Sequence, residues 1–152
     1  MPDVKHPRCH PLLVDDDRDY MVVLRRCFEK VGVPGSQIQS CTNGDEAIQV
    51  LSGGGEIPSF VLLDLHLPRR TGLEVLEWIR SAPPPLAEVP VFMLTSSSEP
   101  VDVSRAFELR VRSYFIKPPE APGLEIVLEA ILADWIGRRR HAVVAGRLEG
   151  RP

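Results

Sequence analysis

The sequence predicts an α/β protein in which five parallel strands form one sheet with helices on both faces. Short apolar runs alternate with segments of helical periodicity through five strand–helix repeats. These runs are continuously apolar, which is typical of strands buried on both faces of a parallel sheet. The chain has 152 residues, of which 43% are hydrophobic and 26% charged, as expected for one globular domain.

The first repeat begins with a strand over residues 11–14. Its proline, Pro11, is tolerated there because it is the first residue of the strand. Residues 17–31 carry apolar side chains at helical spacing, which predicts a helix. The sequence Gly-Val-Pro-Gly at 32–35 ends that helix.

The second repeat is the weakest of the five. Residues 36–41 predict a poorly apolar strand. Asn43 or Asp45 caps a helix that runs to about Leu51, and the three glycines at 53–55 end it.

The third repeat contains a buried acid. Residues 60–65 form a continuous apolar strand that is interrupted only by Asp64, and residues 72–81 predict the following helix. An acid inside such a strand is costly unless it is paired, so Asp64 has no simple structural explanation. Three prolines at 83–85 then form a stiff connector.

The last two repeats complete the sheet. Strands are predicted over residues 89–95 and 113–116, and helices over residues 99–110 and 123–137. All crossovers in such a sheet are expected to be right-handed.

The domain boundaries follow from this pattern. We expect a flexible segment over residues 1–10, the folded domain over 11–137, and a basic tail over 138–152. The tail is too short for a DNA-binding or catalytic output domain. It is interpreted as a solvated extension, with a docking or dimerising segment as the alternative.

Composition excludes several classes of protein. A net charge of −3 argues against a general nucleic-acid binder, and no apolar run is long enough to span a bilayer. The N-terminus lacks the apolar region of a secretory signal. Three scattered cysteines fit reduced thiols, so we expect a cytoplasmic protein.

Polar side chains gather at one edge of the predicted sheet. In parallel sheets, sites form outside the carboxyl ends of the strands. The residues at those ends are Asp15, Asp16, Asp64, Thr95 and Lys117. Three close carboxylates require a counter-charge. Ligation by oxygen alone favours Mg²⁺, with Mn²⁺ as the alternative.

These residue types favour one kind of chemistry. The lysine and the threonine suit the oxygens of a phosphoryl group, and a carboxylate can accept that group to form an aspartyl-phosphate. The site therefore predicts Mg²⁺-dependent phosphoryl transfer to an aspartate, with catalysis by positioning and charge neutralisation.

At these residues the chain resembles the receiver domain of two-component response regulators. The likeness covers roughly residues 12–135 and includes the acidic pair, "LLDLHLPRRTGLEVL" around Asp64, the threonine, and "YFIKPP" around Lys117. It implies the flavodoxin-like strand order 2-1-3-4-5. The chain is similar to single-domain, chemotaxis-regulator-like members, and "LPRRTGLEVL" is similar to regulators associated with phytochromes.

The resemblance implies roles for the acidic residues. Asp64 would accept the phosphoryl group from a phosphohistidine on a sensor histidine kinase or a phosphotransfer protein. Asp16, Asp64 and the backbone carbonyl of His66 would bind Mg²⁺ directly, and Asp15 would act through water. The protein would act on no substrate other than its own phosphoryl group.

The resemblance also implies a switch. Thr95 and Lys117 would bind phosphoryl oxygens, and the peptide bond before Pro118 would be cis. On phosphorylation Thr95 would move toward the phosphoryl group and Tyr114 would turn inward. The surface formed by residues 99–110, 113–116 and 123–137 would then bind a downstream protein or a second copy of the chain.

Other interpretations stay open at this point. Asp17 and Asp19 are assigned to the first turn of the helix that follows, where negative charge is favourable. A haloacid-dehalogenase-type phosphatase with Asp15 as nucleophile would leave Asp64 unexplained and lacks a cap domain. A receiver used only as a scaffold is the remaining alternative, although no site residue is missing.

Overall fold

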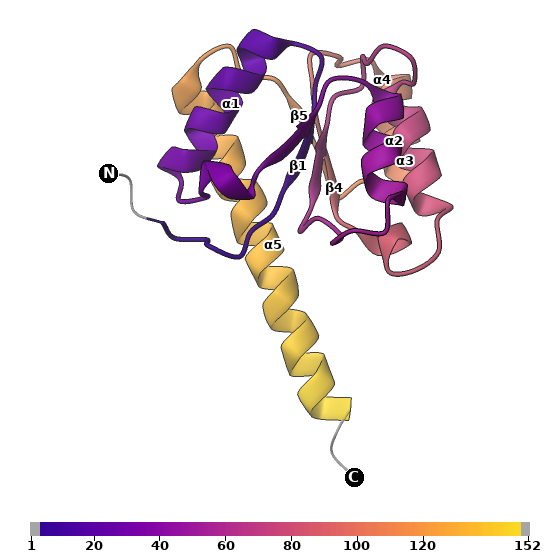
Figure 1. The fold of residues 1–152 in the computed structure, drawn as a ribbon. Coiled ribbons are helices and arrows are strands. Elements are labelled where there is room, and N and C mark those ends of the chain that lie inside the picture. The colour runs from indigo at the N-terminus through magenta and orange to yellow at the C-terminus, as the bar shows by residue number, and fades with distance from the viewer. Residues whose placement is uncertain (1–3, 150–152) are drawn as a thin grey trace.

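The computed structural model describes residues 4–149 and contains a five-stranded, fully parallel sheet. The strand order is β2-β1-β3-β4-β5, which confirms the predicted order and fold class (Figure 1). The strands are β1 (Leu12–Val14), β2 (Gln39–Cys41), β3 (Val61–Leu63), β4 (Val91–Thr95) and β5 (Ser113–Ile116).

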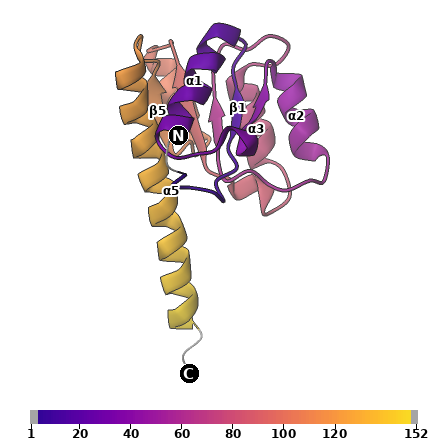
Figure 2. The same ribbon diagram turned by 60° about the vertical axis from the view of Figure 1, so that its left-hand side comes forward.

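Five helices alternate with the strands. They are α1 (Arg18–Lys30), α2 (Gly44–Ser52), α3 (Gly72–Arg80), α4 (Pro100–Glu108) and α5 (Ala121–Glu149), with short 3-10 helices at Gly35–Gln37 and Leu86–Glu88. Helices α1 and α5 lie side by side on one face of the sheet, and α2, α3 and α4 cover the other (Figures 1 and 2). The sheet therefore separates two hydrophobic cores.

Polar side chains cap the first turns of three helices. The Asp17 carboxylate caps α1 by accepting the Tyr20 amide N–H at 3.0 Å, and the Asn43 side chain caps α2. Thr71 and Glu74 form a reciprocal capping box at the start of α3. Of the two caps considered for α2, Asn43 is the one used.

Helix α3 is anchored at both ends. At its start, a Cβ on Gly72 would collide with the backbone carbonyl oxygen of Asp64, so only glycine permits this approach. At its end, the Arg80 guanidinium donates to the carbonyl oxygens of Ala87, Val89, Leu109 and Arg110 at 2.7–3.1 Å. The segment that follows β3 and carries Asp64 thus lies directly against the start of α3.

The N-terminal segment differs from the expectation of flexibility over residues 1–10. Lys5 and His6 donate their amides to the Gly32 carbonyl at 3.0 and 2.8 Å, and Cys9 is fully buried. These contacts hold residues 5–10 against the domain. Their acceptor, Gly32, has a φ of 101°, a conformation that favours glycine and turns the chain just after the end of α1. Residues 1–3 lie outside the described part of the chain.

The last helix is longer than predicted. Helix α5 continues past residue 137 to Glu149 and projects from the domain (Figure 1). Its two glycines there, Gly137 and Gly146, each cost only about 1 kcal/mol relative to alanine, which does not stop a helix. Residues 150–152 of the predicted tail lie outside the described residues. Across residues 4–149, no helix is both long enough and apolar enough to cross a membrane.

Candidate functional site

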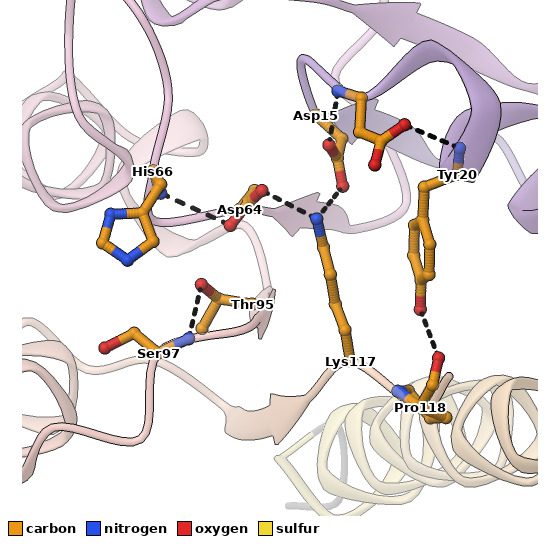
Figure 3. Close-up of polar contacts among 9 residues, drawn as sticks. Asp15, Tyr20, Asp64, His66, Thr95, Ser97, Lys117 and Pro118 are labelled. Atoms are coloured by element: carbon orange, nitrogen blue, oxygen red, sulfur yellow. Dashed lines mark hydrogen bonds and ion pairs between the residues drawn. The ribbon is translucent and has the colours of Figure 1, made fainter. Parts of the chain in front are cut away.

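The residues predicted from strand ends meet at one edge of the sheet (Figure 3). Asp15 follows β1, Asp64 follows β3, Thr95 ends β4 and Lys117 follows β5. Three of these side chains are almost completely buried, with exposed fractions of 3% for Asp15, 5% for Asp64 and 0% for Thr95. Such burial of acids requires a compensating charge.

Lys117 supplies that charge. Its Nζ lies 2.8 Å from Oδ2 of Asp15 and 2.9 Å from Oδ2 of Asp64, and so joins the ends of β1, β3 and β5. The other oxygen of each carboxylate accepts a backbone amide. Asp15 accepts from Asp17 at 2.9 Å, and Asp64 accepts from His66 at 3.3 Å.

Burial and the contacts within this cluster shift the pKa values of Asp15 and Lys117. Burial raises the pKa of Asp15 above its ordinary value, and the hydrogen bond from Lys117 offsets only part of this effect. Burial alone would lower the pKa of Lys117, but the hydrogen bonds to Asp15 and Asp64 outweigh it and raise that pKa. Lys117 therefore holds its proton more strongly in this site than a free lysine does.

The carboxylates also have the arrangement of a cation site. Carboxylate oxygens of Asp15, Asp16 and Asp64 all lie within 4.8 Å of one another. Asp16 is exposed, whereas the other two are buried, so the cluster opens toward solvent on the Asp16 side. An all-oxygen donor set with one solvent-facing side fits Mg²⁺, which keeps several of its waters.

The loop after β4 connects the site to β5. The Thr95 hydroxyl accepts the Ser97 amide N–H at 3.3 Å, and the Ser97 hydroxyl donates to Asp102 in α4 at 2.7 Å. The Tyr114 hydroxyl donates to the Ser97 carbonyl at 2.8 Å. Thr95 and Tyr114 are thus connected through a single residue, Ser97.

One predicted feature of the site is wrong. The cis peptide bond found among residues 4–149 is Pro84–Pro85, so the Lys117–Pro118 bond is trans rather than cis. The lysine still reaches both carboxylates with a trans bond, because its four-carbon side chain is long and flexible.

Two residues of this site are not predicted by the sequence. Tyr20 fits the apolar face of α1, yet its ring centroid lies 4.7 Å from Nζ of Lys117. The sequence predicts only a turn at Ser97, yet this residue is buried and connects Thr95, Asp102 and Tyr114. For Tyr20, the signal in the sequence is a hydroxyl on an otherwise apolar helix face, which needs a partner when it is buried. For Ser97, the signal is its place among three successive serines at 96–98.

The fold and site together define a signalling domain of two-component systems. The family model for the response regulator receiver domain matches residues 12–129, and the chain belongs to this family. This assignment favours the receiver interpretation over the phosphatase considered above.

Relatives agree with this assignment. The chain is 37% identical over 133 residues to the probable methanogenesis regulatory protein FilR2 of Methanothrix harundinacea, covering 85% of this chain and 84% of that protein. Several other curated relatives are longer, and the chain spans about half of their length.

Solved structures show the same fold. The phosphorylated cyanobacterial phytochrome response regulator RcpA superposes with a TM-score of 0.73 at 26% identity, covering 83% of this chain and 92% of that one. The Mn²⁺-bound form of response regulator Rcp1 gives a TM-score of 0.72 at 28% identity, covering 82% and 92%. The predicted likeness to phytochrome-associated regulators is therefore confirmed at the level of similarity.

Proposed function

We propose that Asp64 accepts a phosphoryl group from a phosphohistidine on a histidine kinase or phosphotransfer protein in the cytoplasm. The supporting observation is the placement of Lys117 between Asp15 and Asp64, with Asp16 beside them. A single phosphoacceptor, a cation-binding acidic group and a phosphoryl-binding ammonium are thereby within reach of one another.

The residues that would hold Mg²⁺ are Asp16, Asp64 and the His66 carbonyl, with Asp15 acting through water. The bound cation would neutralise charge on the transferring phosphoryl group and orient it for in-line displacement. The similar response regulator Rcp1 has been solved in a Mn²⁺-bound form, which supports a divalent cation here.

In the transfer step, an Oδ atom of Asp64 forms the new P–O bond while the P–N bond of the phosphohistidine breaks. The imidazole leaves with the electron pair of that bond. Lys117 exchanges its contact with the carboxylates for contact with phosphoryl oxygens, and the Thr95 hydroxyl donates to another of those oxygens. Lys117 follows β5 and Thr95 ends β4, and these two strands are neighbours in the sheet.

The output would be a change in protein contacts. If Thr95 turns toward the phosphoryl group, Ser97 and Tyr114 must adjust, because they are hydrogen-bonded in series. The elements around Tyr114 each expose an apolar side chain, namely Phe107 in α4, Ile116 in β5 and Ile126 in α5. This surface would bind a downstream protein or a second copy of the chain.

The test is incubation of the full chain with Mg²⁺ and acetyl phosphate, followed by intact-mass measurement. We expect an acid-stable, base-labile phosphoryl group on Asp64 that is lost in Asp64→Asn and without Mg²⁺. Asp19→Asn is the matched control, because Asp19 is an exposed aspartate in the first turn of α1 and should leave labelling intact. Labelling on Asp15, or none from acetyl phosphate or candidate kinases, would overturn the proposal.

A further inference from the structure

Tyr20 is the one aromatic residue placed against the Lys117 ammonium among the ring contacts of residues 4–149. A cation within about 6 Å of a ring centroid is attracted by the ring face, and Nζ of Lys117 lies 4.7 Å from that of Tyr20. Figure 3 shows the ring beside the lysine, between α1 and the segment that follows β5.

The same tyrosine contacts the backbone next to the lysine. Its hydroxyl donates to the Pro118 carbonyl at 3.5 Å, which is a long hydrogen bond. Tyr20 therefore contacts the Lys117 ammonium through its ring, and the backbone of the next residue, Pro118, through its hydroxyl. Of the two contacts, that of the ring is closer to its favourable geometry.

Tyr20 is itself held in place by the acidic segment. Its backbone N–H donates to Asp17 at 3.0 Å, and the Asp17 N–H donates to Asp15 at 2.9 Å. Asp15 in turn accepts from Lys117. A closed ring of contacts thus runs through Asp15, Asp17, Tyr20 and Lys117, and it fixes where the aromatic ring stands relative to the site.

We propose that Tyr20 is a positioning residue, whose ring keeps the Lys117 ammonium over the phosphoacceptor when the lysine leaves the carboxylates to bind a phosphoryl group. This inference rests on the proposed function. A lysine side chain has about 2 kcal/mol of rotamer entropy to lose when it is fixed. The ring restricts the rotamers of Lys117 in advance, without contacting the phosphoryl group or the metal ion.

The test compares Tyr20→Leu, which removes the ring face, with Tyr20→Phe, which retains it. The ligand is beryllofluoride, a phosphoryl analogue, titrated calorimetrically at saturating Mg²⁺. We expect Tyr20→Leu to weaken beryllofluoride binding about 3- to 10-fold, the range of a partly desolvated cation–π contact, and Tyr20→Phe to bind like the wild type.

Binding of Mg²⁺ alone distinguishes positioning from general damage. Tyr20 contacts none of the carboxylates through its side chain among the contacts described, so Mg²⁺ binding should not weaken in either variant. Parallel weakening of Mg²⁺ and beryllofluoride would show that the site is merely distorted. Equal losses in Tyr20→Leu and Tyr20→Phe, or no loss in either, would overturn the proposed role of the ring.

A double-mutant cycle adds a readout that needs no ligand. Tyr20→Leu should lower the urea midpoint less in a Lys117→Met background than in the wild type, because the Lys117 ammonium that the ring contacts is already absent. Additive midpoints would overturn the proposal. If wild-type protein bound no beryllofluoride and took no phosphoryl group, the proposed function would fail, whereas a wild-type response that Tyr20→Leu leaves unchanged removes only this inference.

Discussion

The Lys117 ammonium lies 2.9 Å from Oδ2 of Asp64, the proposed phosphoacceptor. The same ammonium lies 2.8 Å from Asp15. A divalent cation that binds these acids therefore takes over part of the charge neutralisation that Lys117 provides without it. The lysine and the cation are linked through shared carboxylates.

Replacing this lysine tests that link. Lys117→Met should destabilise the metal-free protein by about 1–3 kcal/mol, because two buried carboxylates lose their counter-charge. Added Mg²⁺ should raise the free energy of unfolding more in the variant than in the wild type, which urea unfolding with and without Mg²⁺ measures. The control is Arg70→Met, which breaks an exposed pair with Asp45 and should cost less than about 1 kcal/mol. Equal stabilisation of both proteins by Mg²⁺ would contradict the link.

The raised pKa of Asp15 predicts a pH dependence of cation binding. A carboxyl whose pKa is raised by burial takes up a proton at a higher pH than an exposed aspartate, and the protonated form is a poor partner for a cation. Affinity for Mg²⁺ should therefore be lower at a mildly acidic pH than at neutral pH. In Asp15→Asn the affinity should be lower at neutral pH, and its fall with acidification should be shallower. Calorimetric titrations at the two pH values check this, and identical slopes would show that Asp15 does not contribute.

The close approach of Gly72 to Asp64 makes glycine necessary there. In Gly72→Ala the new methyl group meets the Asp64 carbonyl oxygen and the Leu65 backbone, neither of which can move freely. We expect a loss of about 1–3 kcal/mol in stability, with weaker Mg²⁺ binding because Asp64 is displaced. Gly55→Ala is the matched control, since nothing lies within 4 Å of the position that its methyl group would take. An unaltered urea midpoint for Gly72→Ala would argue against the contact.

The hydrogen bond from Tyr114 to the Ser97 carbonyl ties β5 to the loop after β4. Tyr114→Phe should cost about 0.5–1.5 kcal/mol in stability and should speed amide hydrogen exchange at residues 97–99. Substituting the exposed neighbour, Ser98→Ala, should leave that exchange unchanged. Unaltered exchange in Tyr114→Phe would mean that this hydrogen bond does not restrain the loop.

Much of the site could be predicted because its residues stand at strand ends. Asp15, Asp64, Thr95 and Lys117 each mark the end of a recognisable apolar run, and the parallel topology brings those ends to one edge. Asp64, inside the apolar run of residues 60–65, gave the strongest indication of a functional site, since a buried carboxylate needs a partner. The structure supplies that partner in Lys117, 53 residues away in the sequence.

The remaining features depend on contacts that local sequence does not encode. Tyr20 fits a helical apolar pattern whether or not a lysine lies against it, so only the packing of α1 beside the end of β5 reveals the contact. The isomer of the Lys117–Pro118 bond depends on the surrounding structure, because both isomers of a prolyl bond are close in energy. The extension of α5 differs from the prediction because a run of basic residues suggests a solvated tail, although arginines are also good helix formers.

The hydrogen bond from the Asp17 amide to Asp15 has a thermodynamic consequence beyond the site. It connects the start of α1 to the acids that are proposed to bind the cation. Because linkage between two binding events is reciprocal, a protein that bound the start of α1 would change the affinity of these acids for a divalent ion. Such a protein and the divalent ion would then each alter the binding of the other.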